Sequence, residues 1–489
     1  MEGDETVKRL LQEGVTVSPS ALNIFLEKKL DIETLVETCR RQGVWYLEES
    51  FIEEYLLRPA EASELVRSEV CRKKGLPAKD IEARIEFDAN HDVTGKSTCS
   101  GAIEDFYDYF NERFRITKRV LKSRVEYADA TTIEGLKASG GNGKIICMVL
   151  EKTETNAGNL LMTVEDPTGE LTAYVNNNDE KLKGVYGSLM PDEILGVKGL
   201  LKNNLFIANE ITQPDIPISR KINYADEEVY AAFISDIHVG SYLFLEKEFK
   251  AFLDWVNWCG ANPEAAEKLK YICVAGDLVD GIGIYPKQER ELTIPDIYKQ
   301  YDFLAMLLEQ IPSHIKIILG VGNHDAVRLA DPQPALAEDI APRLHAMENV
   351  TLVGSPARFR LHGVEVLMYH GNTLDGMIKN IPGTSYAEPE KPMIEYLKRR
   401  SLAPSYGIDG IAPEKQDYMF IDRVPDILHC GHVHTVGVGK YKGVTILNSG
   451  TWQGKTKYQQ ELGHQPTPAR VPLVNLQNHQ VRVLDFSIG

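Results

Sequence analysis

Six short apolar runs in the second half of the 489-residue chain constrain its fold more than any other feature. They lie between residues 229 and 449 and read VYAAFI, YICVA, IKIILG, VEVLMY, DILHC and VTILNS. Nearly every position in them is apolar, which is typical of strands buried on both faces. Helical segments such as EKEFKAFLDWVNWCG separate several of the runs. We therefore predict an α/β domain over residues 225–489.

Polar side chains follow five of these runs, at the point where each strand would end. Ligands of an open α/β sheet bind beyond the carboxyl ends of its strands, so these side chains should converge. In an extended chain, side chains two residues apart point the same way, which would aim Asp236 with His238, and His432 with His434, at one point. The side chains at the five strand ends are Asp236, His238, Asp277, Asp280, Asn323, His324, Asp325, His370, His432 and His434.

Seven of these side chains form a set of candidate metal ligands. Carboxylate oxygens, imidazole nitrogens and one amide oxygen suit manganese, iron or zinc better than calcium. Seven ligands are too many for one ion, but they suit two ions about 3.5–4 Å apart that share a carboxylate, clamp a phosphate and activate water. We expect two divalent metal ions, Mn²⁺ first with Fe²⁺ or Zn²⁺ as alternatives, bound by Asp236, His238, Asp277, Asn323, His370, His432 and His434.

Residues beside the candidate ligands also have expected roles. Gly276, Gly322 and Gly431 stand next to them, and we expect tight turns there that let the backbone approach the substrate closely. A single D-x-H or G-H-x-H could arise by chance, but five such motifs in order argue against chance. In the run HCGHVH, we assign His429 and Cys430 to the core or to a role in orienting ligands.

Composition narrows the class of protein further. The seven cysteines are odd in number and form no C-x-x-C pair, so neither a disulfide framework nor a zinc ribbon is expected. A net charge of −17 argues against a protein that coats nucleic acid nonspecifically, but allows a local basic groove or a basic partner. Because no run reaches roughly 18 apolar residues and the amino terminus lacks a signal peptide, we expect a cytoplasmic protein without membrane contact.

Three further segments precede the α/β domain. Residues 1–60 carry short helical patterns, one with Ser18 as a candidate N-cap, and predict a helical protein-interaction domain. Residues 61–125 include the turn-forming stretch FDANHDVTGKSTCSG and predict a flexible, basic connector. Residues 126–217 hold short strands broken by DPTG and KNN, and predict an OB-like barrel. The aromatic rings available there to stack bases are few: Tyr174, Tyr186 and Phe206. A structural or protein-docking barrel is therefore equally well supported.

The series D-x-H, G-D-x-x-D, G-N-H-D, H and G-H-x-H resembles the signature of the calcineurin-like metallophosphoesterases, over about residues 225–450. The resemblance implies an α/β domain with two layers of sheet. It also implies that His324 stabilises the transition state or protonates the leaving oxygen, with Asp325 orienting it. By the same likeness Asp277 bridges two metals, one held by Asp236, His238, Asp277 and His434, the other by Asp277, Asn323, His370 and His432.

The order of the segments resembles the family of small subunits of archaeal family D DNA polymerases, which are related to the B-subunits of eukaryotic replicative polymerases. The stretches VEDPTGELTAYV, NSGTWQGKTKYQ and PTPARVPLVNL carry the same likeness. The resemblance implies a metal-dependent proofreading 3′–5′ exonuclease that acts on a DNA 3′ end beside a large catalytic polymerase subunit. Two alternatives stay open: an idle scaffold that assembles the large subunit, and a phosphoesterase acting on proteins or small phosphodiesters.

Two basic clusters and the carboxyl terminus leave further alternatives. Lys398, Arg399 and Arg400 fit a contact with DNA or the large subunit as well as they fit a solvated helix end. The tail QVRVLDFSIG loosely echoes a sliding-clamp peptide, but its alternation favours a final strand. A solvated helix face is favoured over DNA contact for the other basic residues, Arg113, Arg115, Lys118, Arg119, Lys122 and Arg124.

Overall fold

The computed structural model describes most of the chain from residue 77 onward and a few positions before it. The described residues are 16–18, 21–22, 24, 26, 46–47, 77–258, 262–408 and 410–488. The chain divides into two compact units, Met1–Gly75 and Leu76–Gly489. In the first, β1 (Thr16–Val17) pairs in parallel with β2 (Tyr46–Leu47), and Ser18 Oγ accepts a hydrogen bond from the Ala21 nitrogen at 3.2 Å. The rest of the predicted helical domain, residues 1–60, lies outside the described residues.

Two six-stranded sheets form the framework of the second unit. The first sheet has the order β12-β11-β10-β9-β18-β19, with β9 Tyr230–Ile234, β10 Leu269–Val274, β11 Lys316–Leu319, β12 Val350–Leu352, β18 Arg470–Asn475 and β19 Gln480–Asp485. The second has the order β16-β17-β15-β14-β13-β3, with β3 Ile85–Phe87, β13 Ala357–Leu361, β14 Val364–Met368, β15 Ile427–Cys430, β16 Gly437–Tyr441 and β17 Val444–Asn448. Each of the six predicted apolar runs is a strand, and these six strands run parallel within each sheet.

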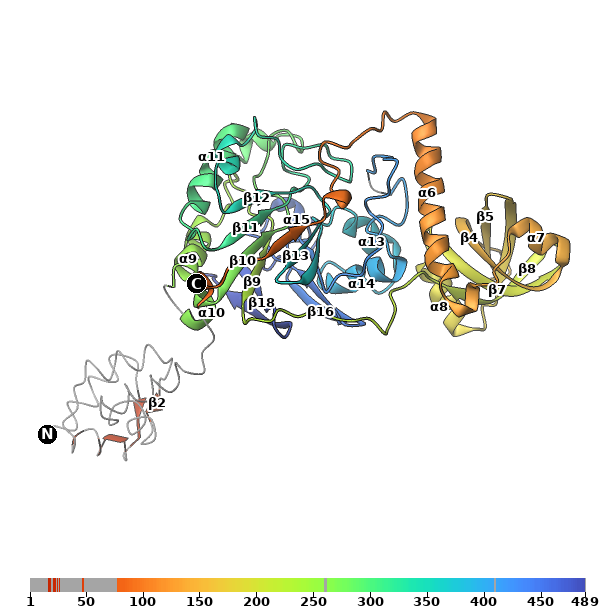
Figure 1. The fold of residues 1–489 in the computed structure, drawn as a ribbon, viewed down its shortest axis with the longest axis horizontal. Helices are drawn as coiled ribbons and strands as arrows, with labels where there is room; N and C mark the ends of the chain where they lie inside the picture. Colours follow the sequence, from red (N-terminus) through yellow and green to blue (C-terminus); the bar gives the residue numbers. More distant parts are fainter. Residues whose placement is uncertain are drawn as a thin grey trace. The chain divides into compact units, whose positions relative to one another are not determined.

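The two sheets pack face to face, with helices on both outer sides (Figure 1). Alternate residues of β10 show the layering, because Tyr271 and Cys273 face the core between the sheets while Ile272 and Val274 face the helices. Helices α9 (Glu246–Val256), α10 (Pro263–Glu267), α11 (Ile297–Leu308) and α12 (Pro342–His345) belong to the first sheet's side, and α13 (Leu374–Asn380) and α14 (Glu390–Arg399) to the second's. The predicted α/β domain with two layers of sheet is confirmed.

A closed five-stranded barrel precedes most of the two-sheet domain in the chain. Its strand order is β4-β5-β6-β8-β7, with β4 Gly141–Glu154, β5 Leu160–Asp166, β6 Gly169–Val175, β7 Ile194–Lys202 and β8 Leu205–Thr212, and it carries α7 Ile133–Ser139 and α8 Glu180–Ser188. The predicted barrel is therefore confirmed. Tyr186 and Phe206 are buried in its core, so these two rings are not offered to bases at its surface.

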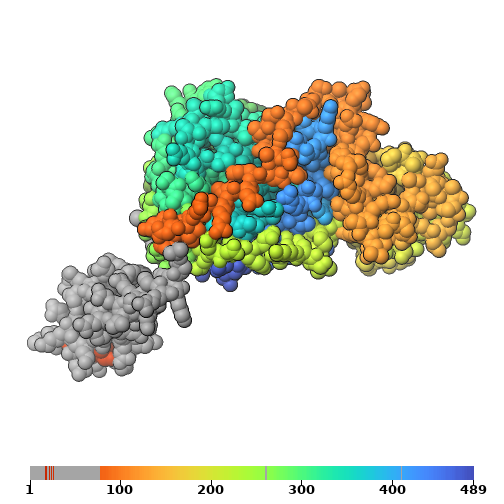
Figure 2. Space-filling model, in the orientation of Figure 1, coloured from red at the N-terminus to blue at the C-terminus, as the bar shows by residue number. Residues whose placement is uncertain are grey.

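The prediction of a flexible connector over residues 61–125 is wrong for its described part. Strand β3 pairs antiparallel with β13 at the edge of the second sheet. The 20-residue helix α6 (Ile103–Lys122) packs on both the barrel and the two-sheet domain (Figure 1). In Figure 2 this segment runs as a band across one face. The polar stretch between β3 and α6 is held by distant partners, since Glu414 accepts a hydrogen bond from the Thr98 nitrogen at 3.0 Å.

Buried ion pairs join the barrel, α6 and the two-sheet domain, and they account for part of both basic clusters. Arg113 of α6 pairs with Asp417 at 2.9 Å, and Arg399 at the end of α14 pairs with Glu193 at the barrel at 2.7 Å. Arg400 donates to the Ile421 carbonyl oxygen at 2.8 Å. The predictions of a solvated helix end or a DNA contact are therefore wrong for Arg399 and Arg400, whereas Lys398 stays half-exposed.

The carboxyl-terminal segment forms the last strand of the first sheet, as the alternation predicts. Strand β19 pairs antiparallel with β18. Phe486 lies beside Phe252 and Trp255, with ring centroids 5.5 and 5.9 Å apart. A peptide that binds a sliding clamp would need the Phe486 ring to be free, and here the ring packs against Phe252 and Trp255. Over the described residues, no helix is at once long and apolar enough to span a bilayer.

Replacing Arg399 by methionine should lower the free energy of unfolding by about 3–5 kcal/mol, because Glu193 and Glu395 would lose a buried charge partner. Denaturant unfolding of the full chain, followed by circular dichroism, measures this change. Lys391→Met is the matched control: the Lys391–Glu388 pair is exposed, so its loss should cost less than about 1 kcal/mol. Equal stability of the two variants would contradict the anchoring role of Arg399.

Candidate metal centre

All seven candidate ligands come together where the parallel strands of both sheets end. Asp236 and His238 follow β9, Asp277 follows β10 and Asn323 follows β11 in the first sheet. His370 follows β14, and the other two histidines follow β15, in the second sheet. Three overlapping groups of side chains place their ligand atoms within 4.8 Å of one another: Asp236, His238 and His434; Asp236, Asp277 and His370; and His238, Asp280 and His324.

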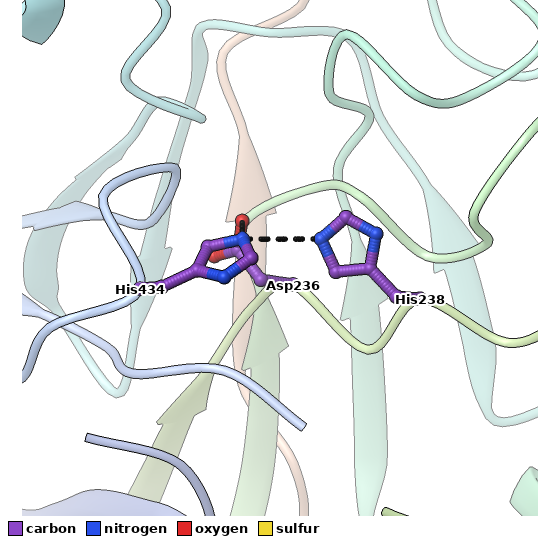
Figure 3. Close-up of side chains that lie close together, drawn as sticks. All are labelled: Asp236, His238 and His434. Carbon is purple, nitrogen blue, oxygen red and sulfur yellow. Dashed lines mark hydrogen bonds and ion pairs between the residues drawn. The ribbon is translucent and has the colours of Figure 1, made fainter. Parts of the chain in front are cut away.

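The first cluster of ligands joins Asp236, His238 and His434 (Figure 3). His434 Nε2 lies 3.1 Å from His238 Nε2 and 3.3 Å from Asp236 Oδ1. The second cluster joins Asn323, His370 and His432. Asn323 Oδ1 lies 3.0 Å from His370 Nε2 and 3.1 Å from His432 Nδ1, and the two ring nitrogens are 3.3 Å apart.

Asp277 contacts both clusters. Its Oδ2 lies 3.7 Å from His238 Nε2 and 3.3 Å from His370 Nε2. Burial lowers the pKa of His370, but the charge and hydrogen bond of Asp277 outweigh burial and raise the pKa to about 10. Burial alone would raise the pKa of Asp277, and its histidine neighbours hold it well below the usual range instead. The carboxylate is therefore ionised, as a shared ligand must be.

The ring orientations fit bound cations. His370 Nδ1 donates to the Ala275 carbonyl oxygen at 2.6 Å, and His238 Nδ1 donates to Asp280 Oδ1 at 3.2 Å, so the Nε2 atoms of both rings face the clusters. Donor atoms bonded to one zinc-sized ion at about 2.1 Å lie roughly 3.0–3.4 Å apart, which matches the spacings in both clusters. A bound cation would take the place of protons on these ring nitrogens, because a ligating imidazole is neutral. The residues therefore fit two divalent cations.

The backbone of the ligands differs from the extended chain that the sequence suggests. The φ angles are +51° at Asp236, +54° at His238, +49° at Asp277, +69° at His432 and +57° at His434. The left-handed region costs a non-glycine residue about 1–3 kcal/mol and recurs at functional sites. Asp236 and His238, and His432 and His434, do converge as expected. The reason is not an extended chain, because left-handed turns direct these side chains toward the clusters.

Gly322 and Gly431 allow the ligand loops to approach each other closely. We predicted a close approach of the backbone to a substrate instead. A Cβ atom on Gly322 would collide with Asp277 Oδ1 and the Asp277 nitrogen. A Cβ atom on Gly431 would collide with the side chains of Ser235 and Asp236. Both positions therefore require glycine, because the carboxylates of Asp277 and Asp236 lie where a side chain would begin.

His324 and Asp325 lie beside the clusters, but they do not interact as the family resemblance implies. His324 Nδ1 donates to the Asp280 carbonyl oxygen at 2.8 Å, so Asp280 orients the ring. Asp325 accepts hydrogen bonds from the Gly322 nitrogen at 2.8 Å and from Tyr301 Oη at 3.0 Å, and thereby ties the ligand loop to α11. Burial, assisted by the charge of Asp277, raises the pKa of Asp325 to about 7.

Two further carboxylates orient ligands, and the sequence motifs assign neither of them a role. Asp280 holds both His238 and His324 and is itself held by Gln453 Nε2 at 2.9 Å. It is visible in the sequence as the second acid of G-D-x-x-D. Asp375 Oδ2 lies 3.7 Å from His432 Nε2; burial would raise the pKa of Asp375, but the hydrogen bond and charge of His432 outweigh burial and lower it. No motif spacing marks Asp375.

His429 and Cys430 are core residues, as expected. His429 Nε2 lies 2.9 Å from Ser449 Oγ, and the ring packs against Phe233 with centroids 5.0 Å apart. Burial lowers the pKa of His429 to about 3, so the ring is neutral, and burial raises the pKa of the Cys430 thiol.

The two ligand clusters open into a pocket of about 480 Å³. Carboxylates and aromatic rings both line it, and His324 lines it together with ligands of both clusters. Residues beyond the ligands that line it include Asp280, Tyr285, Glu291, His324, Asp375, Tyr386, Gln453, Lys457, Tyr458, Gln459, Glu461 and His464. A phosphate ester can therefore reach the ligands from solvent.

Two sheets packed face to face, with this ligand set at their carboxyl edge, are the arrangement that the resemblance to calcineurin-like metallophosphoesterases predicts, and a five-stranded barrel lies beside them. A family model for the B-subunits of DNA polymerases alpha and epsilon matches residues 231–436. The chain is 42% identical over 475 residues to the DNA polymerase II small subunit of Archaeoglobus fulgidus, a match that covers 95% of this chain and 94% of that relative. The chain belongs to the family of archaeal DNA polymerase II (family D) small subunits.

Other relatives agree with this assignment. The DNA polymerase II small subunit of Methanocaldococcus jannaschii is 42% identical over 407 residues, covering 82% of this chain and 68% of its own. That of Methanothermobacter thermautotrophicus is 39% identical over 410 residues, covering 83% and 84%. A solved structure described as a novel archaeal phosphodiesterase aligns with 52% of this chain and 99% of its own at 12% identity and TM-score 0.28. The assignment rests on the sequence relatives.

Saturating Mn²⁺ should stabilise the folded chain, because the clusters exist only when both sheets are formed. At about 100 times the dissociation constant the gain is about 2.7 kcal/mol per site. Thermal unfolding with and without Mn²⁺ measures it. Asp277→Asn should lose most of this gain, since Asp277 contacts both clusters, whereas the exposed control Asp485→Asn should keep it. An equal gain in both variants would contradict the assignment of Asp277.

Asp375→Asn should weaken Mn²⁺ binding about 10–100-fold, because His432 would lose the carboxylate that orients it. Isothermal titration calorimetry of the full chain measures the affinity. Asp108→Asn, an exposed acid on α6, serves as the control and should bind Mn²⁺ like the parent. Parent-like affinity in Asp375→Asn would show that the His432 ring is held by its packing alone.

Proposed function

We propose that this chain is the proofreading 3′–5′ exonuclease subunit of an archaeal replicative DNA polymerase, hydrolysing DNA phosphodiesters beside a large catalytic subunit. The observation that supports this most is the pair of ligand clusters joined by Asp277 at the floor of an open pocket. The relatives are named small subunits of DNA polymerase II, which supports a large subunit as partner and a DNA 3′ end as substrate.

The ligands divide into two sets around Asp277. Divalent cations, Mn²⁺ first with Fe²⁺ or Zn²⁺ as alternatives, supply Lewis acidity and an activated water when bound. Asp277 is common to both sets. One cation would be held by Asp236, His238, Asp277 and His434, and the other by Asp277, Asn323, His370 and His432.

His324 is the group proposed to handle a proton. The Asp280 carbonyl oxygen accepts the hydrogen of Nδ1, which leaves Nε2 as the ring nitrogen available to a substrate oxygen. Asp277 Oδ1 accepts a hydrogen bond from the backbone nitrogen of His324 at 2.9 Å, and this bond holds the backbone of His324 against the clusters. Nε2 can donate to the leaving oxygen only in the imidazolium form of the ring, and such general acid catalysis contributes about 10²–10⁴-fold.

A scaffold without catalysis is the second candidate. It is supported by the barrel, whose Tyr186 and Phe206 are buried, and by the ion pairs that fix the barrel to the two-sheet domain. A phosphoesterase acting on proteins or small phosphodiesters is the third candidate, and it leaves the barrel without a purpose. Rates on a DNA end, a phosphopeptide and a cyclic nucleotide would rank the three.

In Mn²⁺, the full chain, alone or with its large subunit, should shorten a single-stranded or mismatched 3′ end. Asp277→Ala should abolish cleavage, and His324→Ala should slow it about 10²–10⁴-fold, because the proton donor is lost. Gel analysis of end-labelled DNA measures the rates, and circular dichroism checks folding. His345→Ala, an exposed histidine on α12, is the control and should cleave like the parent.

Two outcomes would reject the nuclease. Cleavage at the parent rate by Asp277→Ala would place the chemistry elsewhere. No cleavage by the parent, with fewer than about one ion per chain after purification, would favour the scaffold, because a two-metal reaction needs both sites filled.

A further inference from the structure

The pocket offers little positive charge to a nucleic acid. Lys457 is the one lysine or arginine among the described residues that line it, against five carboxylates: Asp277, Asp280, Glu291, Asp375 and Glu461. Phosphate contacts usually supply most of the grip on a nucleic-acid strand. Outside the ligand clusters, this pocket must therefore hold a strand by another interaction.

Aromatic rings supply that interaction. Tyr285 and Tyr458 line the pocket with 37% and 68% of their surface exposed. Within the described part of the chain, neither ring packs against another aromatic ring, so no stacked ring competes with a ligand for their faces. Tyr386 and His464, also in the lining, instead pack against each other with centroids 3.9 Å apart and ring planes tilted by 32°. Among the rings that line the pocket, Tyr285 and Tyr458 are thus the two without an aromatic partner in the described residues.

Both free rings are carried by segments that are fixed to the ligand clusters. Tyr458 lies on the short helix α15 (Lys457–Glu461), none of whose residues is buried. Gln459, the next residue, caps that helix with Thr456 and lies 2.8 Å from His434 Nδ1. Tyr458 is thereby held one residue from a contact with a metal ligand.

Tyr285 is held in a similar way on the other segment. Its hydroxyl donates to Glu291 Oε2 at 3.1 Å. Gln288 accepts a hydrogen bond from the Ile284 nitrogen at 2.9 Å and donates to the Asp280 carbonyl oxygen at 2.8 Å. Since Asp280 orients His238 and His324, the Tyr285 loop is tied to the same groups that the reaction would use.

We propose that Tyr285 and Tyr458 form a stacking site for the unpaired bases at the 3′ end of a single strand. The inference rests on the proposed nuclease function and adds the residues that would hold the bases of its substrate. Every base has a π-face, so stacking would accept any sequence. A base must unpair and unstack from its duplex before both of its faces are free, so frayed or mismatched ends bind in preference to paired ones.

The test uses the full chain in Mn²⁺ and a single-stranded oligonucleotide with 2-aminopurine at its 3′ end and phosphorothioate terminal linkages, which resist hydrolysis. Stacking should quench the 2-aminopurine fluorescence in the parent. The double variant Tyr285→Ala/Tyr458→Ala should lose the quenching and bind about 10-fold or more weakly, whereas Tyr285→Phe/Tyr458→Phe should keep both. An oligonucleotide with an abasic 3′ end should bind the parent as weakly as the intact one binds the alanine variant.

Tyr107→Ala, an exposed tyrosine on α6, is the matched control and should behave like the parent. Parent-like quenching and affinity in the alanine variant would overturn the stacking site, even if the parent cleaves DNA. Equal affinity of the parent for intact and abasic ends would overturn it as well. If stacking depends on the two tyrosines but the unmodified strand is never shortened, the nuclease proposal fails while the stacking site stands.

Discussion

The carboxylate of Asp277 joins the two ligand clusters, and its position depends on both sheets at once. Asp277 follows β10 in the first sheet, yet its Oδ2 lies 3.3 Å from the Nε2 of His370, which follows β14 in the second. A slip of one sheet against the other would therefore separate the clusters. The apolar layer between the sheets, where Phe233 and Tyr271 pack with Phe359, prevents that slip, and close packing resists displacement of even part of an ångström. The metal centre is in this sense a property of the inter-sheet core.

Left-handed backbone at five ligands is the local consequence of that arrangement. Each costs about 1–3 kcal/mol and persists only where surrounding contacts fix it. Those contacts are visible: the Asp236 nitrogen donates to the Gly276 carbonyl oxygen at 3.0 Å, and the His432 nitrogen donates to Asp236 Oδ2 at 3.0 Å. One ligand's carboxylate thus stabilises the turn that aims another ligand. The clusters and their loops support each other, which is why the glycines at 322 and 431 cannot carry even a methyl group without displacing a carboxylate.

The sequence predicts the strands and the ligand types well because both are local signals: buried strands read as apolar runs, and their ends carry the polar groups. It fails where a contact joins distant residues. The polar stretch before α6 looks flexible until Glu414 is seen to accept from Thr98, and Arg399 looks solvated until Glu193 is placed beside it. Asp375 has no recognisable spacing from His432 because a separate helix, α13, carries it. The left-handed turns are hidden for the same reason, since distant contacts impose them on residues that prefer other conformations.

Charge links the site to the rest of this acidic chain. With a net charge of −17 and a pocket lined by five carboxylates, the protein repels DNA at long range. Bound divalent cations would offset the negative charge at the clusters, where Asp236 and Asp277 belong to the ligand set and Asp280 and Asp375 lie beside ligand histidines. Attraction for phosphate would then be confined to the position where a diester can react, while the surrounding surface disfavours duplex backbone. In the exonuclease proposed above, this arrangement would disfavour binding of a paired end anywhere outside the ligand clusters, because the surrounding surface is acidic.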